Sequence, residues 1–250
     1  MICAIIQARM GSSRLPGKVL MKLNGISVLQ CLINQLEFAK LIDEKIIATS
    51  INIEDDVIYE FTKSIGIDSF RGSYLDVLDR YYQCAKHFSI QHIVRITADC
   101  PLIDPQIIDQ TIEFYKKNNF DYVNNFQEKT FPSGTEVEVF SFSTLEKVWK
   151  NAKKSSEREH VTSYIYTNPE QFSIGFIKHD EDLSHLHWTV DRTEDLDFVK
   201  ILYNKISNRP ILLVDILKII KEDPLILEIN KNTDPKEGYI KSLQNDINNQ

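Results

Sequence analysis

The sequence predicts an α/β fold in which helices cover both faces of a mostly parallel sheet, a doubly wound arrangement. Short apolar runs alternate along the chain with segments of helical periodicity, which is typical of parallel strands joined by helical crossovers. The chain has 250 residues, of which 42% are hydrophobic and 26% are charged. This is enough for one sizeable core. We therefore expect a single domain over residues 1–210 and a C-terminal extension over 211–250.

The alternation is regular up to about residue 120. Strands are recognised as short apolar runs, and helices as apolar residues that recur every three or four positions. Asp104 before Pro105 is a typical helix start, because the aspartate can cap the first turn and proline fits its first position. In order, we expect a strand at 2–7, a helix at 26–39, a strand at 45–50, helices at 54–65 and 74–88, a strand at 92–97 and a helix at 105–118.

Beyond residue 120 the pattern changes to short strands. We expect this region, about 120–190, to add antiparallel strands to the sheet and to supply an acceptor pocket or a dimer contact. A last helix is expected at 193–206, and the polar end of the chain is expected to be mobile. The expected elements of the strand-rich region are strands at 121–126, 136–141, 172–178 and 186–190, around one helical stretch at 143–167.

Charge and composition exclude several classes of protein. The net charge is −7 and the pI is about 5.4, which disfavours nucleic acid and anionic membrane surfaces as partners. No apolar run reaches the length of a membrane span, and the chain begins with a core-like strand rather than a signal segment, so we expect a cytoplasmic protein. The four cysteines show no C-x-x-C pair, which makes a zinc site or a disulfide framework improbable.

The most informative segment is the loop that follows the first strand, from Ala8 to Lys18. It is rich in glycine, serine and cations, and Glu37 is the first acidic residue of the chain. Such loops present backbone amides and positive charge to phosphate groups. Arg9, Arg14 and Lys18 would then reach a triphosphate from different points. The alternative is an ordinary solvated loop.

A kinase-type P-loop does not fit this segment. That motif requires four residues between its first glycine and a Gly-Lys-Ser/Thr sequence. Five residues separate Gly11 from Gly17 here, Pro16 removes an amide, and Val19 stands where the hydroxyl should be. An extended anion-binding loop of another kind remains.

Two carboxylates follow strand ends and can reach the same cleft. Asp99 comes just after the strand at 92–97, and Asp191 ends the strand expected at 186–190. Ligands bind beyond the carboxyl ends of strands in open sheets, and magnesium takes one or two carboxylates together with phosphate oxygens. Asp99 and Asp191 are therefore the expected Mg²⁺ ligands, whereas Asp104 is better explained as a helix cap.

Further candidates are less specific. Arg71 could contact a nucleotide, while Asp76, Asp79 and Arg80 could form ordinary charge pairs along a helix. Alternation after Gly134 places Glu136 and Glu138 on one strand face, where they could bind acceptor hydroxyls or simply be solvated. Arg158 and His160, near a helix start, could meet an anionic acceptor.

The chain closely resembles the spore coat polysaccharide biosynthesis (SpsF-type) cytidylyltransferase family, which is related to CMP-KDO and CMP-acylneuraminate synthetases. The resemblance covers about residues 1–206. It rests on six ordered motifs, QARMGSSRLPGKVL, RGSYLDVLDRYYQCA, RITADCPLIDP, FPSGTEVEVFS, EREHVTSYIY and WTVDRTEDLDFV. Family members often carry an Asp where Thr135 and Glu136 stand, and a Thr-Pro or Glu-Pro pair where Arg192 and Thr193 stand.

The resemblance implies a nucleotidyltransferase fold, of the nucleotide-diphospho-sugar transferase type, that binds CTP and Mg²⁺ and usually forms a homodimer. It implies that Arg14 and Lys18 hold the triphosphate, that amides around Ala8–Gly11 hold the base and phosphates, and that Asp99 and Asp191 hold the metal. We take Arg14, Lys18 and Asp99 as the catalytic residues. The expected nucleotide-binding residues are Gln7, Ala8, Arg9, Met10, Gly11, Ser12, Arg14, Lys18, Arg71, Arg95 and Thr97.

The function expected from these observations is transfer of CMP from CTP to a sugar acid or similar hydroxyl acceptor, with release of pyrophosphate, in surface polysaccharide synthesis. Glu136, Glu138, Arg158 and His160 are the expected acceptor-binding residues. Two alternatives remain open. One is a nucleotide-sugar-dependent glycosyltransferase, for which Asp195-x-Asp197 would be the metal motif, and the other is a nucleotide-binding module without catalysis.

Overall fold

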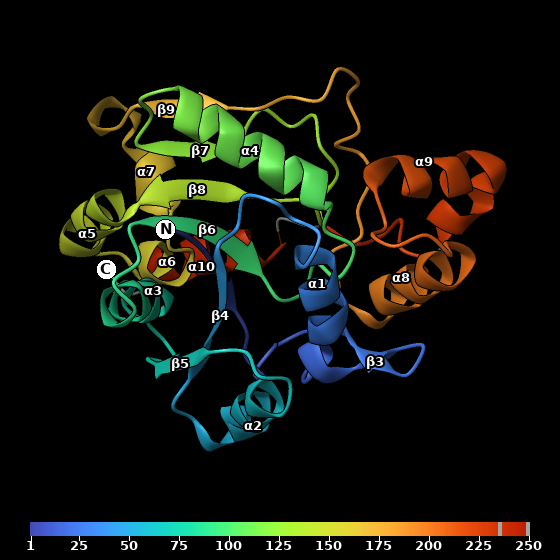
Figure 1. The fold of residues 1–250 in the computed structure, drawn as a ribbon, viewed down its shortest axis with the longest axis horizontal. Helices are drawn as coiled ribbons and strands as arrows, with labels where there is room; N and C mark the ends of the chain where they lie inside the picture. Colours follow the sequence, from blue (N-terminus) through green and yellow to red (C-terminus); the bar gives the residue numbers. More distant parts are fainter. Residues whose placement is uncertain (235–236, 249–250) are drawn as a thin grey trace.

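The fold is built on a seven-stranded sheet with the strand order β5-β4-β1-β6-β8-β7-β9 (Figure 1). The structure is a computed structural model that describes residues 1–234 and 237–248. Two further short strands, β2 (Lys22–Leu23) and β3 (Ile26–Ser27), form a separate antiparallel pair. The strands of the main sheet are β1 (Ile2–Gln7), β4 (Glu44–Ser50), β5 (Ser69–Gly72), β6 (His92–Thr97), β7 (Tyr122–Asn124), β8 (Glu138–Ser141) and β9 (Ile174–Phe176).

The sheet is mixed but mostly parallel, which confirms the expected fold class. β1 pairs in parallel with both β4 and β6, and β4 pairs in parallel with β5. Of the strand-rich region, only β8 pairs antiparallel, with β6 and with β7, while β7 and β9 are parallel to each other. The expectation of antiparallel strands after residue 120 therefore holds for one strand.

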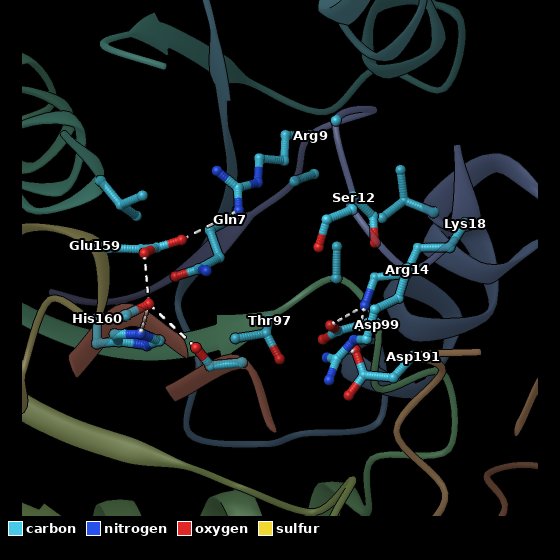
Figure 2. A pocket seen from close by; sticks show the side chains of 18 of the residues that line it. Gln7, Arg9, Ser12, Arg14, Lys18, Thr97, Asp99, Glu159, His160 and Asp191 are labelled. Atoms are coloured by element: carbon cyan, nitrogen blue, oxygen red, sulfur yellow. Dashed lines mark hydrogen bonds and ion pairs between the residues drawn. The ribbon is translucent and has the colours of Figure 1, made fainter. Parts of the chain in front are cut away.

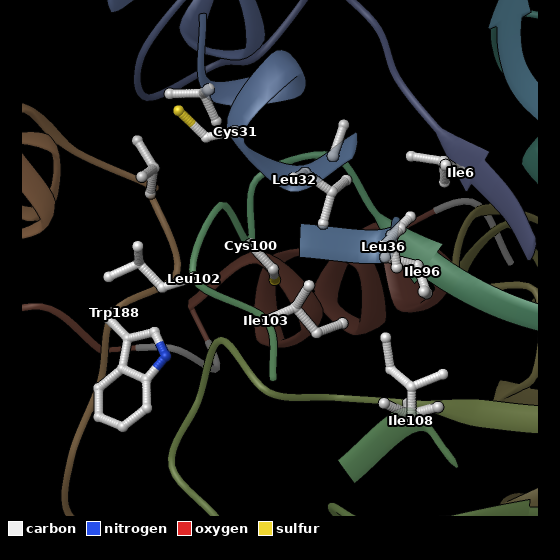
Figure 3. Close-up of a cluster of buried hydrophobic side chains, with 14 of the residues drawn as sticks. Ile6, Cys31, Leu32, Leu36, Ile96, Cys100, Leu102, Ile103, Ile108 and Trp188 are labelled. Carbon is white, nitrogen blue, oxygen red and sulfur yellow. The ribbon is translucent and has the colours of Figure 1, made fainter. Parts of the chain in front are cut away.

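Helices cover both faces of the sheet, and β1 is therefore buried on both sides. Ile2, Ala4 and Ile6 belong to one hydrophobic cluster, part of which Figure 3 shows, and Cys3 and Ile5 belong to the other. The helices are α1 (Val28–Leu36), α2 (Asp56–Ser64), α3 (Val77–His87), α4 (Pro105–Lys117), α5 (Phe142–Asn151), α6 (Ser155–Glu159), α7 (Ser163–Thr167), α8 (Thr193–Lys205), α9 (Leu213–Glu222) and α10 (Glu237–Asn248).

The prediction of a strand at 186–190 was wrong. Only His187 forms an isolated bridge, with Ser133. The amide of Trp188 donates to the Ser133 carbonyl at 2.9 Å, and the amide of Val190 donates to the Asp99 carbonyl at 2.8 Å. The apolar alternation at 186–190 therefore belongs to a loop whose backbone is hydrogen-bonded to other loops. The helical stretch expected at 143–167 is divided into α5, α6 and α7.

The chain after residue 210 packs closely on the rest of the fold. Gln35 of α1 donates to the carbonyls of Ile103 and Ile211, at 2.9 and 2.6 Å, and accepts from the Ile211 amide. The polar end that was expected to be mobile forms α10, apart from residues 235–236 and 249–250, which lie outside the described residues. Within the described part of the chain, no helix combines the length and apolar character that a bilayer span requires.

Asp104 joins α4 to the C-terminal extension, which gives a test of this packing. Its carboxylate is 4% exposed and accepts from the amides of Gln106 and Leu213, each at 2.7 Å. We expect Asp104→Ala to lower the free energy of unfolding by about 2 kcal/mol in urea titrations, because one cap and one buried hydrogen bond are lost. Asp182→Ala, which removes a cap from an exposed turn, is the control, and equal losses in both variants would contradict the assignment.

Candidate active site

A cavity of about 450 Å³ opens beyond the carboxyl ends of β1 and β6 (Figure 2). Its walls come from the loop after β1, the start of α3, the end of β6, the end of α6, Asp191 and the first turns of α10. This is the edge at which open α/β sheets bind ligands. The cavity therefore combines the expected cationic loop with segments that are far apart in the sequence.

A buried carboxylate holds the loop after β1. Asp55 is fully buried; its Oδ1 accepts from the Met10 amide at 2.6 Å, and its Oδ2 accepts from the Ser50 hydroxyl. The Met10 carbonyl in turn accepts from the amides of Ser12 and Gly17 at 2.9 and 2.8 Å. Gly17 has a φ of +74°, a conformation that glycine adopts without strain. The loop is thus pre-formed.

Lys18 lies at the centre of a cluster of four charges. Its side chain is directed between Asp99 and Asp191, and Nζ lies 2.6 Å from Asp99 Oδ2 and 2.9 Å from Asp191 Oδ1 (Figure 2). Arg14 Nη2 lies 2.6 Å from the same Asp191 oxygen. The predicted catalytic and metal-binding residues, drawn from three segments of the chain, therefore converge on one point.

Burial makes these interactions strong. Lys18 is 8% exposed. Burial alone would lower the pKa of Lys18, but Asp99 and Asp191 outweigh it and raise the pKa. Burial would likewise raise the pKa of Asp99, whereas Lys18 and the hydroxyl of Thr97 bring it below its ordinary value. Lys18 and Asp99 therefore stabilise each other in their charged forms.

Asp195 fixes the position of Asp191. Asp195 is fully buried, and its Oδ2 accepts from the amides of Asp191 and Arg192 at 3.1 and 2.8 Å. Its Oδ1 accepts from Asn230 at 3.2 Å and from Thr233 at 2.9 Å. Asp195 is therefore structural, and its pair in the Asp-x-Asp sequence, Asp197, is exposed on α8 and bonds Lys200.

A second network lies at the other side of the cavity. Arg95 donates to Gln7 Oε1 at 3.0 Å and forms an ion pair with Glu138. Glu138 also accepts from the hydroxyls of Tyr122 and Thr162. Glu138 does not line the cavity itself, so it acts through Arg95, which does.

Most predicted nucleotide-binding residues line the cavity. Two do not: the Met10 amide is bonded to Asp55, and Arg71 is paired with Asp56 at 2.6 Å and donates to the Ser50 carbonyl. The Ala8 amide is also occupied, by the Ala48 carbonyl. The predicted residues that line the cavity are Gln7, Ala8, Arg9, Gly11, Ser12, Arg14, Lys18, Arg95, Thr97, Asp99, His160 and Asp191.

The other predicted acceptor residues have partners outside the cavity. Arg158 pairs with Asp76 at 2.6 Å and donates to the Trp149 carbonyl. Glu136 accepts from the Gly134 amide at 2.7 Å, and burial raises its pKa. Only His160 of the four expected acceptor residues reaches the cavity.

Helix α10 closes one side of the cavity, which the sequence did not lead us to expect. Glu237 contacts Arg14 at 3.4 Å and Arg192 at 2.7 Å. The Ser242 hydroxyl lies 2.7 Å from Glu159 and 2.9 Å from His160 Nε2, and Asp246 accepts from the Ser156 amide at 2.9 Å. These contacts with α6 hold the helix across the loop after β1. The sequence contains no local signal for these contacts, because each residue of α10 is distant in sequence from its partner.

No group of three or more His, Cys, Asp and Glu side chains that could hold a metal occurs in the described part of the chain. Asp99 and Asp191 nevertheless bring two carboxylates to one cation, the Lys18 ammonium. A hard divalent ion that keeps water and phosphate oxygens as further ligands needs no more than this. The two residues fit such an ion.

Comparison with known proteins identifies the family. The model of the family described as Cytidylyltransferase matches residues 3–230. The chain is 41% identical to an uncharacterized protein, MJ1063, of Methanocaldococcus jannaschii (94% of this chain, 96% of that one), and 32% identical to the spore coat polysaccharide biosynthesis protein SpsF of Bacillus subtilis (93% and 95%). It is 37% identical to a 3-deoxy-manno-octulosonate cytidylyltransferase of Trichlorobacter lovleyi over 47% of this chain and 46% of that one.

A solved structure supports the same assignment. The structure of a cytidylyltransferase from Leptospira borgpetersenii superimposes with a TM-score of 0.87 at 33% identity, covering 93% of this chain and 98% of that chain. The similarity therefore extends over nearly the whole of both chains.

The contact between His160 and α10 predicts a dependence on pH. Burial lowers the pKa of His160 below its ordinary value of 6.5, and Arg95 and Arg9 act in the same direction against Glu159. The unfolded chain therefore binds the proton first, so the contribution of His160 to stability is full above pH 6.5 and is lost as the pH falls below it. We expect melting temperature to fall more between pH 7 and pH 5 in the wild type than in His160→Gln. Parallel curves for the two proteins would contradict this prediction.

Proposed function

As a member of the cytidylyltransferase family, this chain is a CTP-dependent nucleotidyltransferase, and we propose that it transfers CMP to a hydroxyl of a small acceptor with release of pyrophosphate. The observation that carries the proposal is the cluster of Arg14, Lys18, Asp99 and Asp191 at the mouth of a pre-formed anion loop. Two cations and two carboxylates at one point suit a triphosphate whose charge must be matched as it reacts.

The reaction is an in-line displacement. The oxygen of the acceptor hydroxyl forms a bond to the α-phosphorus of CTP and loses its proton to water, and the bond from that phosphorus to the oxygen bridging to the β-phosphate breaks. The electron pair leaves with pyrophosphate. We assign to Arg14 and Lys18 the binding of the departing phosphates. No covalent intermediate on the protein is needed, because positioning and charge neutralisation suffice.

We assign Asp99 and Asp191 as the residues that hold Mg²⁺. Their convergence on the Lys18 ammonium supports this role. When bound, the ion would orient the phosphates and increase the reactivity of the acceptor oxygen. Lys18 would keep both carboxylates aligned in the free protein.

The acceptor that we propose is a sugar acid, used in the synthesis of a surface polysaccharide. The names of two relatives support this: one is a 3-deoxy-manno-octulosonate cytidylyltransferase and the other a spore coat polysaccharide biosynthesis protein. Arg9 and His160 lie on the side of the cavity away from Asp191 (Figure 2), and Lys241 also lines the cavity. The cations Arg9 and Lys241 can bind a carboxylate of the acceptor.

The remaining expectations follow from this proposal. The glycosyltransferase alternative has no support from Asp195 and Asp197, because the first is buried and the second is exposed and paired with Lys200. We propose a cytoplasmic location, where CTP is available. We also propose a homodimer, as the family resemblance implies.

Ligand binding is the first test. CTP with Mg²⁺ should raise the melting temperature of the purified protein, and UTP, GTP and ATP should do so less. A ligand at about one hundred times its Kd adds about 2.7 kcal/mol to the free energy of unfolding, which is readily measured. Equal or absent responses to all four nucleotides would reject the proposed activity and favour a module without catalysis.

Loss of Lys18 should affect catalysis strongly. We expect Lys18→Ala to lower kcat for pyrophosphate release by about 10²–10³-fold, as when one pre-organised charge donor is removed. Lys22→Ala removes an exposed lysine four residues away that does not line the cavity, and it should retain wild-type turnover. Folding of both variants is checked by circular dichroism. Wild-type turnover by Lys18→Ala would show that Lys18 does not serve the reaction.

A further inference from the structure

Two arginines, Arg14 and Arg192, donate to one carboxylate oxygen at the edge of the cavity. Oε2 of Glu237 lies 3.4 Å from Nη1 of Arg14 and 2.7 Å from Nη2 of Arg192. Among the described residues, Glu237 lines the cavity and Arg192 does not, so Arg192 meets the cavity through this carboxylate. Proteins bind phosphate with guanidinium groups that converge in this way. Glu237 therefore occupies a place in which a phosphate oxygen would have the same two partners.

This contact includes a part of the chain that the family match does not reach. The match covers residues 3–230, whereas α10 begins at Glu237. Arg192 lies within the match, as the residue before α8, and its amide donates to the buried Asp195 at 2.8 Å. The backbone of Arg192 is thus fixed, while its side chain is 44% exposed. The meeting of Arg192 with Glu237 is therefore a feature of this chain that the family match does not explain.

Glu237 is the carboxylate of this site that an incoming anion can replace most easily. Asp191 is buried, and both Lys18 and Arg14 hold it. The Glu237 side chain is 44% exposed, and an ion pair this open to water contributes little, because water screens it. Hydrogen bonds from Arg192 and then Arg14 lower the pKa of Glu237, so it is negatively charged near neutral pH. A phosphate group brings more charge and more acceptor oxygens to the same two guanidinium groups.

Replacement of Glu237 does not require the helix that carries it to move. Glu237 is the first residue of α10, and Ser242 and Asp246 hold the helix further along by their hydrogen bonds to α6. Rotation of the Glu237 side chain toward solvent releases both guanidinium groups. Figure 2 shows Arg14 next to Lys18, and these are the residues to which we assign the departing phosphates. The released place therefore adjoins the reacting triphosphate.

We propose that Arg192 and Arg14 bind the terminal phosphate of the triphosphate, and that Glu237 occupies this place in the free protein as a competing anion. This inference rests on the proposed function and extends it by one binding residue, Arg192. The two partners then act in opposite directions on the same ligand, because Arg192 strengthens its binding and Glu237 weakens it. A contact that served only to hold α10 in place would affect both variants alike.

The test measures binding of inorganic tripolyphosphate and of CMP by calorimetry at low ionic strength. We expect Arg192→Gln to bind tripolyphosphate about 10-fold more weakly, as for loss of one charge-assisted contact. Glu237→Gln should bind it about 2–5-fold more tightly, because an exposed ion pair no longer has to be broken. CMP has no terminal phosphate, so both variants should bind it as the wild type does. Added salt should reduce both effects on tripolyphosphate.

An exposed ion pair on α8 supplies matched controls. Lys200 and Asp197 lie 3.3 Å apart, with side chains 39% and 54% exposed, and neither lines the cavity. Lys200→Gln and Asp197→Asn remove the same kinds of charge, and both should bind tripolyphosphate as the wild type does. Melting temperatures verify that all four variants are folded.

Other outcomes would overturn the inference. Weaker binding of tripolyphosphate by both Arg192→Gln and Glu237→Gln would mean that the pair only positions Arg14. Unchanged binding by both would mean a surface ion pair without a role, and a wild type that does not bind tripolyphosphate would reject the site. The expected results with tripolyphosphate, together with equal responses to CTP, UTP, GTP and ATP, would support this inference and reject the proposed function alone.

Discussion

The functional edge of this molecule depends on one buried ammonium group, that of Lys18. It joins Asp99 and Asp191, which lie 81 and 173 positions away in the sequence. The Val190 amide also donates a hydrogen bond to the Asp99 carbonyl, next to this ion pair. Three segments are therefore fixed relative to one another. The loop after β1, the end of β6 and the segment before α8 form one unit, and the cavity has its shape for that reason.

The regular part of the fold could be predicted because it is encoded locally. β1, β4 and β6 are short apolar runs, and α4 carries its own start signal in Asp104 and Pro105. The segment at 186–190 shows the same alternation as a strand, but its amides bond to loops. Helix α10 could not be located by such reasoning, because its contacts with α6 depend on residues such as Ser156 and His160 that are about eighty to ninety positions away.

The site was predictable where charge follows a strand end. Arg14, Lys18 and Asp99 were identified in this way, and they converge. Asp55 was not, because its role depends on burial: in the sequence it resembles an ordinary acidic helix start. Its burial comes with its contacts to Met10 and Ser50, which no local pattern reveals.

The two cations of the phosphate-binding cluster already have partners in the free protein, and this decides what they contribute. Arg14 and Lys18 hold carboxylates, so a phosphate there replaces existing partners and gains only the difference between two charged interactions. Removal of one partner from a buried ion pair costs more than the pair itself contributes, because the remaining charge is left uncompensated. The carboxylates of Asp99 and Asp191 therefore keep both cations in place before a nucleotide enters the cavity.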